Sequence, residues 1–401
     1  MKKIIMHIDV NNAFLSWTAV DLLNKGYKYD IRNSYAVIGG DESKRSGVVL
    51  ARSTLCKKIG ITTGEPLYLA RKKCPVLKVY PPNYKLYEEM SNKLFQFLGK
   101  YTPDIEVYSI DECFINYTKV KKLYGDEIAF AYKLKEKIKK ELGFTVNIGI
   151  GNNKLCAKMA SDFKKPDMVH TLYMEEVERK MWPLPIENLF GIGRKTAPKM
   201  RELGINTIYD LAHADFQKMY KYFKNQAGKY IEAANGIGDD EVISEESAPK
   251  GISKSTTLPR DIANKQELYK VLEKIASNVA YLLRAEKKYA GVVAVIVRDK
   301  YFNNKTHQQK LKNPTNLTND IIKVAKKLFD EVWEDEPIRL IGIRLDNLTD
   351  NCPYQMSLFE DIEKREKEEK LEKIVDDINQ KFGEKAVKRA SFVKKNNNDV
   401  V

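Results

Sequence analysis

The chain has 401 residues, of which 43% are hydrophobic and 31% are charged. Because one core rarely grows beyond about 250–300 residues, this length predicts several domains. The net charge of +14 favours a polyanionic partner, above all nucleic acid. The five cysteines are scattered without metal-ligand spacing, and neither a signal-peptide core nor an apolar run of roughly 20 residues is present. These features exclude a disulfide framework and a membrane span, and they predict a cytoplasmic protein.

The first half of the chain predicts a βαββαβ unit with an insertion after its first strand. The expected elements are a strand at 3–9, a helix at 83–101, strands at 105–109 and 112–117, a helix at 126–142 and a strand at 145–151. This order is that of a ferredoxin-like sheet. The inserted residues 11–80 begin with a helix that Asn12 is expected to cap and that ends at Gly26, followed by short strands and helices.

The second half predicts a helical block, a linker and another βαββαβ unit. A basic helical stretch covers about 172–235, and the acidic segment 236–249 is interpreted as an exposed linker because it has few anchoring apolar residues. The same element order then returns without a visible sequence repeat, as strands at 251–258, 289–298, 305–311 and 338–345 and helices at 265–287 and 319–333. The last fifty residues form a tail with one charged helix, about 360–382.

Three acidic residues in apolar strands are the strongest chemical signal. Asp9 ends the first strand, and Asp111 and Glu112 stand at the start of another. Buried carboxylates repel one another and lose hydration, a cost that a pair of divalent cations would relieve. Since adjacent strand residues point to opposite faces, a turn at 110–112 is needed to bring them together. Oxygen ligands suit Mg²⁺ or Mn²⁺ rather than zinc, and such a pair of ions promotes in-line displacement at phosphorus.

The histidines do not add to this signal. They lie far apart in the sequence and are interpreted as structural: His7, His170, His213 and His307. Catalytic-triad chemistry has no support.

Four segments together resemble a known family. Residues 6–14, 109–115, 149–161 and 165–166 read MHIDVNNAF, SIDECFI, GIGNNKLCAKMAS and KP. In this order they are similar to the Y-family lesion-bypass DNA polymerases, in particular the bacterial polymerase IV branch, and the similarity covers residues 3–350. It implies an α+β right-hand polymerase with a ferredoxin-like palm, small inserted fingers, a helical thumb and a βαββαβ little finger. The implied domains are 1–10 with 81–171 (palm), 11–80 (fingers), 172–238 (thumb), 239–250 (linker), 251–350 (little finger) and 351–401 (tail).

The resemblance also implies roles for single residues. Asp9, Asp111 and Glu112 match the acids that bind two Mg²⁺, which Mn²⁺ can replace, and the carbonyl of Val10 is a further expected ligand. Phe14 matches the aromatic steric gate that selects deoxynucleotides, although a core phenylalanine on the first helix is the alternative. Lys165 matches a lysine that contacts the incoming triphosphate.

Several positions depart from the family pattern. Thr54 and Lys57 stand where a tyrosine and an arginine grip the triphosphate, so a point charge replaces a bidentate fork. We therefore expect a weaker hold on the nucleotide. Asn11 and Ala13 replace an aspartate and an aromatic residue that are not core metal ligands. Val48 and Leu50 match the roof over the nascent base pair.

Two regions are expected to hold DNA. The segment 189–204 has the glycines and basic helix start of a helix-hairpin-helix, with a plain αα-hairpin as the alternative. Its expected phosphate contacts are Gly191, Gly193, Arg194 and Lys195. The little finger is expected to lie in the major groove. Its candidate phosphate contacts are Lys254, Arg298, Lys300, Lys305 and Lys310.

The tail carries a short motif similar to those by which bacterial polymerases bind the sliding clamp. Its residues are Gln355, Ser357, Leu358 and Phe359, with the last two as apolar anchors. Docking of these anchors onto the protein's own domain is the alternative.

The sequence thus predicts a monomeric, clamp-associated, template-directed DNA polymerase that binds primer–template DNA and dNTPs. With no segment left for a proofreading exonuclease, low fidelity is expected. A nucleotidyl cyclase would share the two-metal carboxylates but would leave the thumb, second domain and tail unexplained. A catalytically weak DNA-binding or clamp-binding accessory is the other alternative, because of Thr54 and Lys57.

Overall fold

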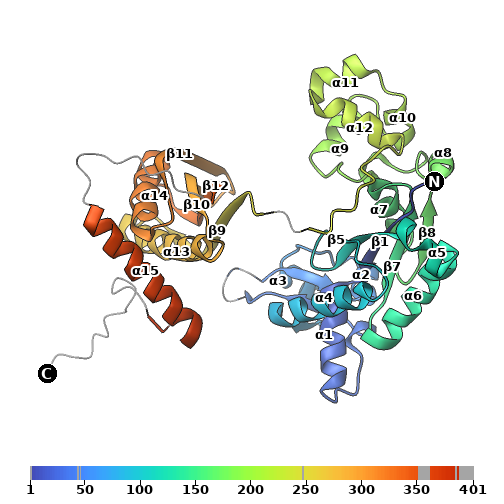
Figure 1. The fold of residues 1–401 in the computed structure, drawn as a ribbon, viewed down its shortest axis with the longest axis horizontal. Coiled ribbons are helices and arrows are strands. Elements are labelled where there is room, and N and C mark those ends of the chain that lie inside the picture. The colour runs from blue at the N-terminus through green and yellow to red at the C-terminus, as the bar shows by residue number, and fades with distance from the viewer. Residues whose placement is uncertain are drawn as a thin grey trace. The chain divides into compact units, whose positions relative to one another are not determined.

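The computed structural model describes residues 2–42, 45, 47–245, 248–350, 362–383 and 386–387. These residues divide into two compact units (Figure 1), one made of residues 2–41 and 47–245, and the other of residues 42, 45, 248–350, 362–383 and 386–387. The expected clamp motif with Gln355, Ser357, Leu358 and Phe359 lies outside the described residues, as does Cys352. No helix among the described residues is long and apolar enough to cross a membrane.

A five-stranded sheet with the order β5-β6-β1-β7-β8 is the centre of the first unit. Its central strand β1 pairs antiparallel with both β6 and β7, and β8 adds to β7 in parallel. The first four strands have the expected ferredoxin-like order, whereas β8 was not expected from the sequence. The strands are β1 (Ile5–Val10), β5 (Ile105–Val107), β6 (Glu112–Asn116), β7 (Val146–Gly151) and β8 (Val169–Leu172).

The two faces of this sheet are covered by different helices. The even-numbered residues of β1 pack with α4 (Tyr84–Gly99) and α6 (Glu127–Leu142) in the main core, and the short α5 (Lys121–Tyr124) adjoins α6. The opposite face packs against α7 (Lys154–Asp162), which the sequence analysis did not predict. Because side chains alternate along a strand, His7 and Asp9 both face α7. One helix is therefore placed directly beside the expected catalytic acids.

Glycine makes this close approach possible. A Cβ on Gly149 of β7 would lie 2.0 Å from the backbone oxygen of Ala157 and 2.3 Å from the backbone nitrogen of Ser161. Both atoms belong to α7, so a side chain at this position cannot coexist with the observed helix position. The glycines of the 149–161 motif thus set the distance between α7 and the sheet.

The inserted segment forms a small three-stranded sheet with the order β3-β2-β4. It comprises α1 (Ala13–Asn24), β2 (Ala36–Gly39), β3 (Val49–Arg52), α2 (Thr54–Lys58), α3 (Leu67–Lys73) and β4 (Lys78–Tyr80), of which β4 was not expected. Asn12 is the N-cap residue of α1, as expected, but its side chain makes no capping hydrogen bond. Asn12 adopts a left-handed conformation, and its side-chain amide donates to the carbonyl of Arg52 at 2.6 Å, tying α1 to β3 instead.

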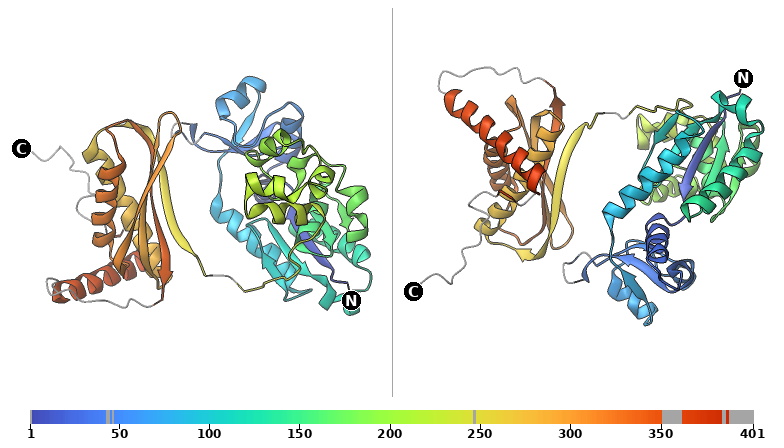
Figure 2. Two further views of the ribbon diagram at one scale, coloured as in Figure 1. Left: turned by 90° about the horizontal axis from the view of Figure 1, so that it is seen from above. Right: turned by 60° about the horizontal axis from the view of Figure 1, so that its bottom comes forward.

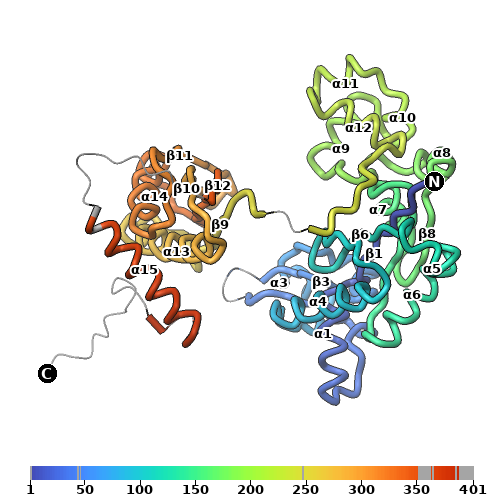
Figure 3. Tube along the Cα trace, in the orientation of Figure 1, coloured from blue at the N-terminus to red at the C-terminus, as the bar shows by residue number. Residues whose placement is uncertain are grey.

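A block of helices completes the first unit (Figure 3), and its core also includes Cys156, Met159 and Ala160 of α7 and Leu172 of β8. Its helices are α8 (Val177–Lys180), α9 (Thr196–Glu202), α10 (Ile208–Ala212), α11 (Phe216–Phe223) and α12 (Gln226–Ala234).

The acidic segment after this block is largely exposed, as expected, but it is also anchored to the rest of the first unit. Asp239 pairs with Lys154 at 2.6 Å, and the backbone N–H of Ile243 donates to Glu106 at 2.9 Å. Val242 packs against a small core cluster beneath α7. Two polar contacts and the side chain of Val242 therefore anchor the first part of this segment.

The second unit is the predicted βαββαβ domain. Its strands β9 (Gly251–Ile262), β10 (Tyr289–Asp299), β11 (Asn304–Thr315) and β12 (Ile338–Thr349) form an antiparallel sheet with the order β11-β10-β12-β9. Helices α13 (Lys265–Ala285) and α14 (Thr318–Val332) cover one face of it (Figure 2). The strand order differs from that of the first sheet, so the two units share element order without sharing topology.

The C-terminal helix α15 (Ile362–Phe382) is held by charges. Arg284 of α13 is 2.9 Å from Glu372 and 2.6 Å from Asp376. The apolar side chains of Leu371, Ile374 and Phe382 on this helix are exposed. The helix thus contacts the domain through its acidic side, the opposite of what its apolar residues suggest.

Candidate active site

The three predicted acids meet at the ends of β1 and β6. Asp9 lies directly opposite Glu112 in the antiparallel register. The N–H of Val10 donates to the carbonyl of Asp111 at 3.0 Å. The N–H groups of Tyr108 and Ser109 both donate to the carbonyl of Glu112, which closes a tight turn. The predicted bend is therefore present, and it brings Asp111 and Glu112 to the same end of the sheet as Asp9.

Asp9 is largely buried and forms an ion pair with a lysine. Its side chain is 18% exposed, and the ammonium of Lys165 lies 3.1 Å from its Oδ2. Burial raises the pKa of Asp9, an effect that Lys165 only partly offsets. Lys165 also pairs with Asp162 at 2.8 Å. The structure therefore joins two predicted site residues that are 156 positions apart in sequence.

Glu112 is held by two residues whose contacts the sequence analysis missed. His7 Nε2 lies 3.0 Å from Oε2 of Glu112, and the ammonium of Lys158 contacts the same oxygen. Burial by itself would raise the pKa of Glu112, but His7 and Lys158 lower it to about 2. His7 is buried, as expected of a structural histidine, but its contact with Glu112 was not expected, and the only available signal for Lys158 was its position inside the 149–161 motif.

His7 is fixed from its other side. Its Nδ1 is 2.8 Å from the hydroxyl of Ser161, and the ring is fully buried. Burial lowers the pKa of His7, which favours the neutral imidazole. The ring is therefore held in one orientation beneath Glu112.

The carboxylates suit divalent cations in donor type and in charge. The three acids supply oxygen donors, which Mg²⁺ and Mn²⁺ prefer, and the two most buried of them each attract a lysine ammonium. Among the described residues, no three His, Cys, Asp or Glu side chains already stand in a metal-binding arrangement. Asp111 is engaged by Ser109, whose hydroxyl donates to Oδ1 at 2.7 Å. The residues therefore fit a divalent metal in donor type and in charge.

The predicted nucleotide contacts lie on α1 and α2. Phe14 stacks on Tyr87 with ring centroids 4.4 Å apart and planes 6° apart, so its ring has a packing role. Thr54 and Lys57 are exposed on α2, and Leu50 is partly buried in the adjacent core. Asn11 is buried and accepts from the N–H of Asp167 at 2.8 Å, which gives this departure from the family pattern a structural role.

The predicted phosphate contacts of the helical block stand together. Gly191 has a φ of 93°, which a left-handed turn requires. Gly193, Arg194 and Lys195 are exposed just before α9. These four residues of the predicted phosphate-binding segment are therefore exposed next to one another.

The five basic residues predicted in the second unit do not share one face. Lys254 and Lys305 stand opposite the core residues Ile343 and Val297, on the helix-covered face, and Lys305 pairs with Glu334 at 2.8 Å. Arg298 and Lys310 occupy the alternate register positions and point to the open face. Lys300 lies between β10 and β11.

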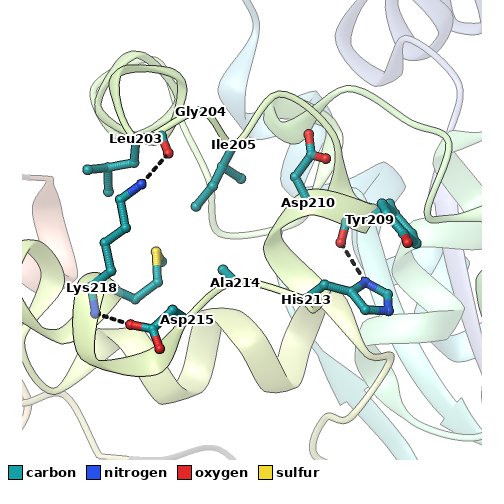
Figure 4. A pocket seen from close by; sticks show the side chains of 10 residues that line it. Leu203, Gly204, Ile205, Tyr209, Asp210, His213, Ala214, Asp215 and Lys218 are labelled. Carbon is teal, nitrogen blue, oxygen red and sulfur yellow. Dashed lines mark hydrogen bonds between the residues drawn. The ribbon is translucent and has the colours of Figure 1, made fainter.

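A pocket of about 310 Å³ lies among α9, α10 and α11 (Figure 4). Lys218 donates to the carbonyl of Leu203 at 3.0 Å, and Asp215 caps α11. The Nδ1 of His213 is 2.9 Å from the carbonyl of Tyr209. These polar groups have partners within the helical block, and none of the predicted site residues lines the pocket.

Comparison with known proteins agrees with this geometry. Residues 8–162 match the impB/mucB/samB family, residues 175–205 match the IMS family HHH motif, and residues 249–358 match the C-terminal domain of the impB/mucB/samB family. The chain is 45% identical to the DNA polymerase IV of Clostridium acetobutylicum over 98% of this chain and 99% of that protein. It is 32% identical to DNA polymerase IV 1 of Bacillus subtilis over 98% of this chain and 94% of that protein.

Solved structures give the same result. A Y-family DNA polymerase chimera of Dbh and Dpo4 is similar with a TM-score of 0.75 and 25% identity, covering 87% of this chain and all of that one. An insertion ternary complex of Dbh DNA polymerase has a TM-score of 0.58 and 24% identity.

The fold and the acids at the end of β1 and β6 define a right-hand polymerase. The chain belongs to the Y-family of DNA polymerases, in the polymerase IV branch, and is a DNA-directed DNA polymerase. Membership in this family implies dependence on a divalent metal. A nucleotidyl cyclase would leave the matches at 175–205 and 249–358 unexplained, and that alternative is dropped.

Proposed function

We propose that this polymerase extends a primer opposite damaged templates by two-metal nucleotidyl transfer. The observation that carries the proposal is the convergence of Asp9, Asp111 and Glu112 at one sheet end. Two Mg²⁺ ions, or Mn²⁺, bound by these acids and the carbonyl of Val10 would lower the pKa of the primer hydroxyl and neutralise the leaving pyrophosphate. The part of the chain itself would be to supply these oxygen ligands at one end of the sheet.

The incoming dNTP is assigned to the space beside α1 and α2. Lys165 is already at Asp9 and can exchange that carboxylate for a phosphate oxygen once metal neutralises Asp9. Phe14 excludes a ribose 2′-hydroxyl, because stacking on Tyr87 leaves its ring little freedom to retreat. Thr54 and Lys57 give a weaker triphosphate grip than a bidentate arginine would.

Primer–template DNA is held without reading its sequence. The exposed turn Gly191–Lys195 presents backbone N–H groups and two cations to a phosphate. In the second unit we assign Arg298 and Lys310 to the DNA-facing surface, since they share the open face of the sheet. Lys305 is excluded from this set by its pairs with Glu334 and Glu336.

We further propose that the protein is a cytoplasmic monomer of low fidelity that binds the bacterial sliding clamp. The clamp assignment rests on the sequence Gln355-Met-Ser-Leu-Phe359, with Leu358 and Phe359 as anchors for an apolar pocket.

The test is primer extension with Mg²⁺ on undamaged and abasic templates, with each dNTP and rNTP supplied singly. We expect extension selective for dNTPs that proceeds past the abasic site. Asp111→Ala should lower the rate about 100- to 1,000-fold, as expected when a charge-stabilising group is removed. Binding of the primer–template by Asp111→Ala, measured by fluorescence anisotropy, is the control for folding. Equal extension by Asp111→Ala, or tight DNA binding without extension by the unaltered protein, would contradict the proposal.

A further inference from the structure

Lys158 occupies a special position among the charged residues of the palm. It is 11% exposed at its side chain, although lysine is rarely buried, and its ammonium contacts Oε2 of Glu112. His7 Nε2 lies 3.0 Å from this same oxygen. Both contacts fall on one of the two carboxylate oxygens. These contacts at Oε2 therefore restrict how the carboxylate is oriented. The position of its other oxygen, Oε1, follows from that orientation.

Two aromatic rings hold the ammonium in turn. The Nζ of Lys158 lies 5.1 Å from the ring centroid of Tyr108 and 5.2 Å from that of Phe190. The two rings also contact each other, with centroids 6.2 Å apart at 66°. A cation within about 6 Å of an aromatic face is attracted by its quadrupole, and the attraction grows as water is excluded. Tyr108 and Phe190 thus form an aromatic pair that restricts where the ammonium can sit.

The aromatic pair joins two parts of the polymerase. Tyr108 belongs to the turn that carries Asp111 and Glu112, and its N–H donates to the carbonyl of Glu112. Phe190 directly precedes the phosphate-binding turn at Gly191, and its N–H donates to the sulfur of Met159, the residue after Lys158. A chain of contacts therefore runs from the DNA-binding turn through Phe190 and Lys158 to a catalytic acid.

Lys158 is more confined than Lys165, the other lysine of the site. Lys165 is 34% exposed and pairs with two carboxylates, so it is free to leave Asp9 for another anion. Lys158 is enclosed by α7, the turn and the aromatic pair. It is better suited to stay with Glu112 while a metal binds than to move to a substrate.

We infer that Lys158 is a positioning residue that orients Glu112 for metal binding, with Tyr108 and Phe190 holding its ammonium in place. The inference rests on the proposed function, in which Glu112 is a metal-binding acid. Residues that orient a ligand from outside the coordination sphere commonly change metal affinity about 10–100-fold when they are replaced. A lysine that merely competed with the metal for Glu112 would have the opposite effect, because its removal would strengthen binding.

The experiment is a Mn²⁺ titration of the full chain bound to a dideoxy-terminated primer–template. The electron paramagnetic resonance signal of free Mn²⁺ measures how much metal remains unbound. No turnover occurs, so metal binding is separated from chemistry. We expect Lys158→Met to weaken Mn²⁺ binding about 10-fold or more. Phe190→Leu should weaken it about two- to five-fold, since a partly exposed cation–π contact is worth about 0.5–1 kcal/mol. Lys121→Met, which removes an exposed pair with Glu127, is the matched control.

A double-mutant cycle completes the test. Phe190→Leu should have no further effect in the Lys158→Met background, because its action passes through the ammonium. Unchanged or tighter Mn²⁺ binding by Lys158→Met overturns the inference, and so does a full Phe190→Leu effect without Lys158. Asp111→Ala distinguishes failure of this inference from failure of the proposed function. Unchanged Mn²⁺ binding in that variant would refute the proposed metal site itself. Thermal unfolding and DNA anisotropy check that each variant is folded.

Discussion

Replacing Gly149 by alanine should displace α7 from the sheet and disturb the catalytic acids without touching them. An alanine Cβ would stand 2.0 Å from the backbone oxygen of Ala157, whereas ordinary contacts begin near 3.4 Å. The helix must therefore move by roughly 1.4 Å, because both clashing atoms of α7 are backbone and cannot rotate away.

The energetic cost follows from overpacking. Forcing a methyl group into a filled interface costs about 1–3 kcal/mol, and a backbone clash lies at the upper end of this range. For a unit of about 240 residues, a loss of about 3 kcal/mol lowers the melting temperature by about 6–12 °C. The displaced helix also carries Lys158 and Ser161, so the contacts of Glu112 and His7 loosen together.

Differential scanning calorimetry and the Mn²⁺ titration measure the two effects. The matched control is Gly99→Ala at the end of α4, where an added Cβ meets no atom within 4 Å. That variant should be neutral or more stable by about 0.5–1 kcal/mol, since alanine favours the helix over glycine. A melting temperature for Gly149→Ala within about 2 °C of the unaltered protein would refute the reasoning.

Three further predictions concern other parts of the chain. Phe14→Ala should admit ribonucleotides, measured as a rise in rNTP relative to dNTP incorporation; unchanged selectivity would argue against a steric gate. Arg284→Met breaks the ion pairs that hold α15, at a cost of about 3–5 kcal/mol. Amide hydrogen exchange in residues 362–382 should therefore become faster. Replacement of the exposed Lys367 is the control and should leave the exchange rates unchanged. Lys154→Met releases the anchored part of the linker, and limited proteolysis within 239–245 should become faster; equal cleavage rates would show that Lys154 is no anchor.

The sequence alone determined the features that depend on nearby residues. Alternating apolar residues and glycine turns indicated both βαββαβ units, and the run Ser109–Glu112 predicted the bend that the structure contains. Asp9, Asp111 and Glu112 could be singled out because charge in an apolar strand is costly wherever that strand lies. The sequence placed Asn12 correctly at the start of α1, but it did not indicate that the Asn12 side chain donates to the distant carbonyl of Arg52.

Only the tertiary structure decided which distant residues meet. His7, Lys158 and Ser161 have no local pattern that marks them as neighbours of Glu112, because their contacts depend on how closely α7 approaches β1 and β7. The same holds for Asp239 and Lys154, which turn a segment of apparent linker into an anchored one. Strand order separated Arg298 and Lys310 from Lys254 and Lys305, since side-chain direction follows from register, and register is set by pairing between strands far apart in the chain.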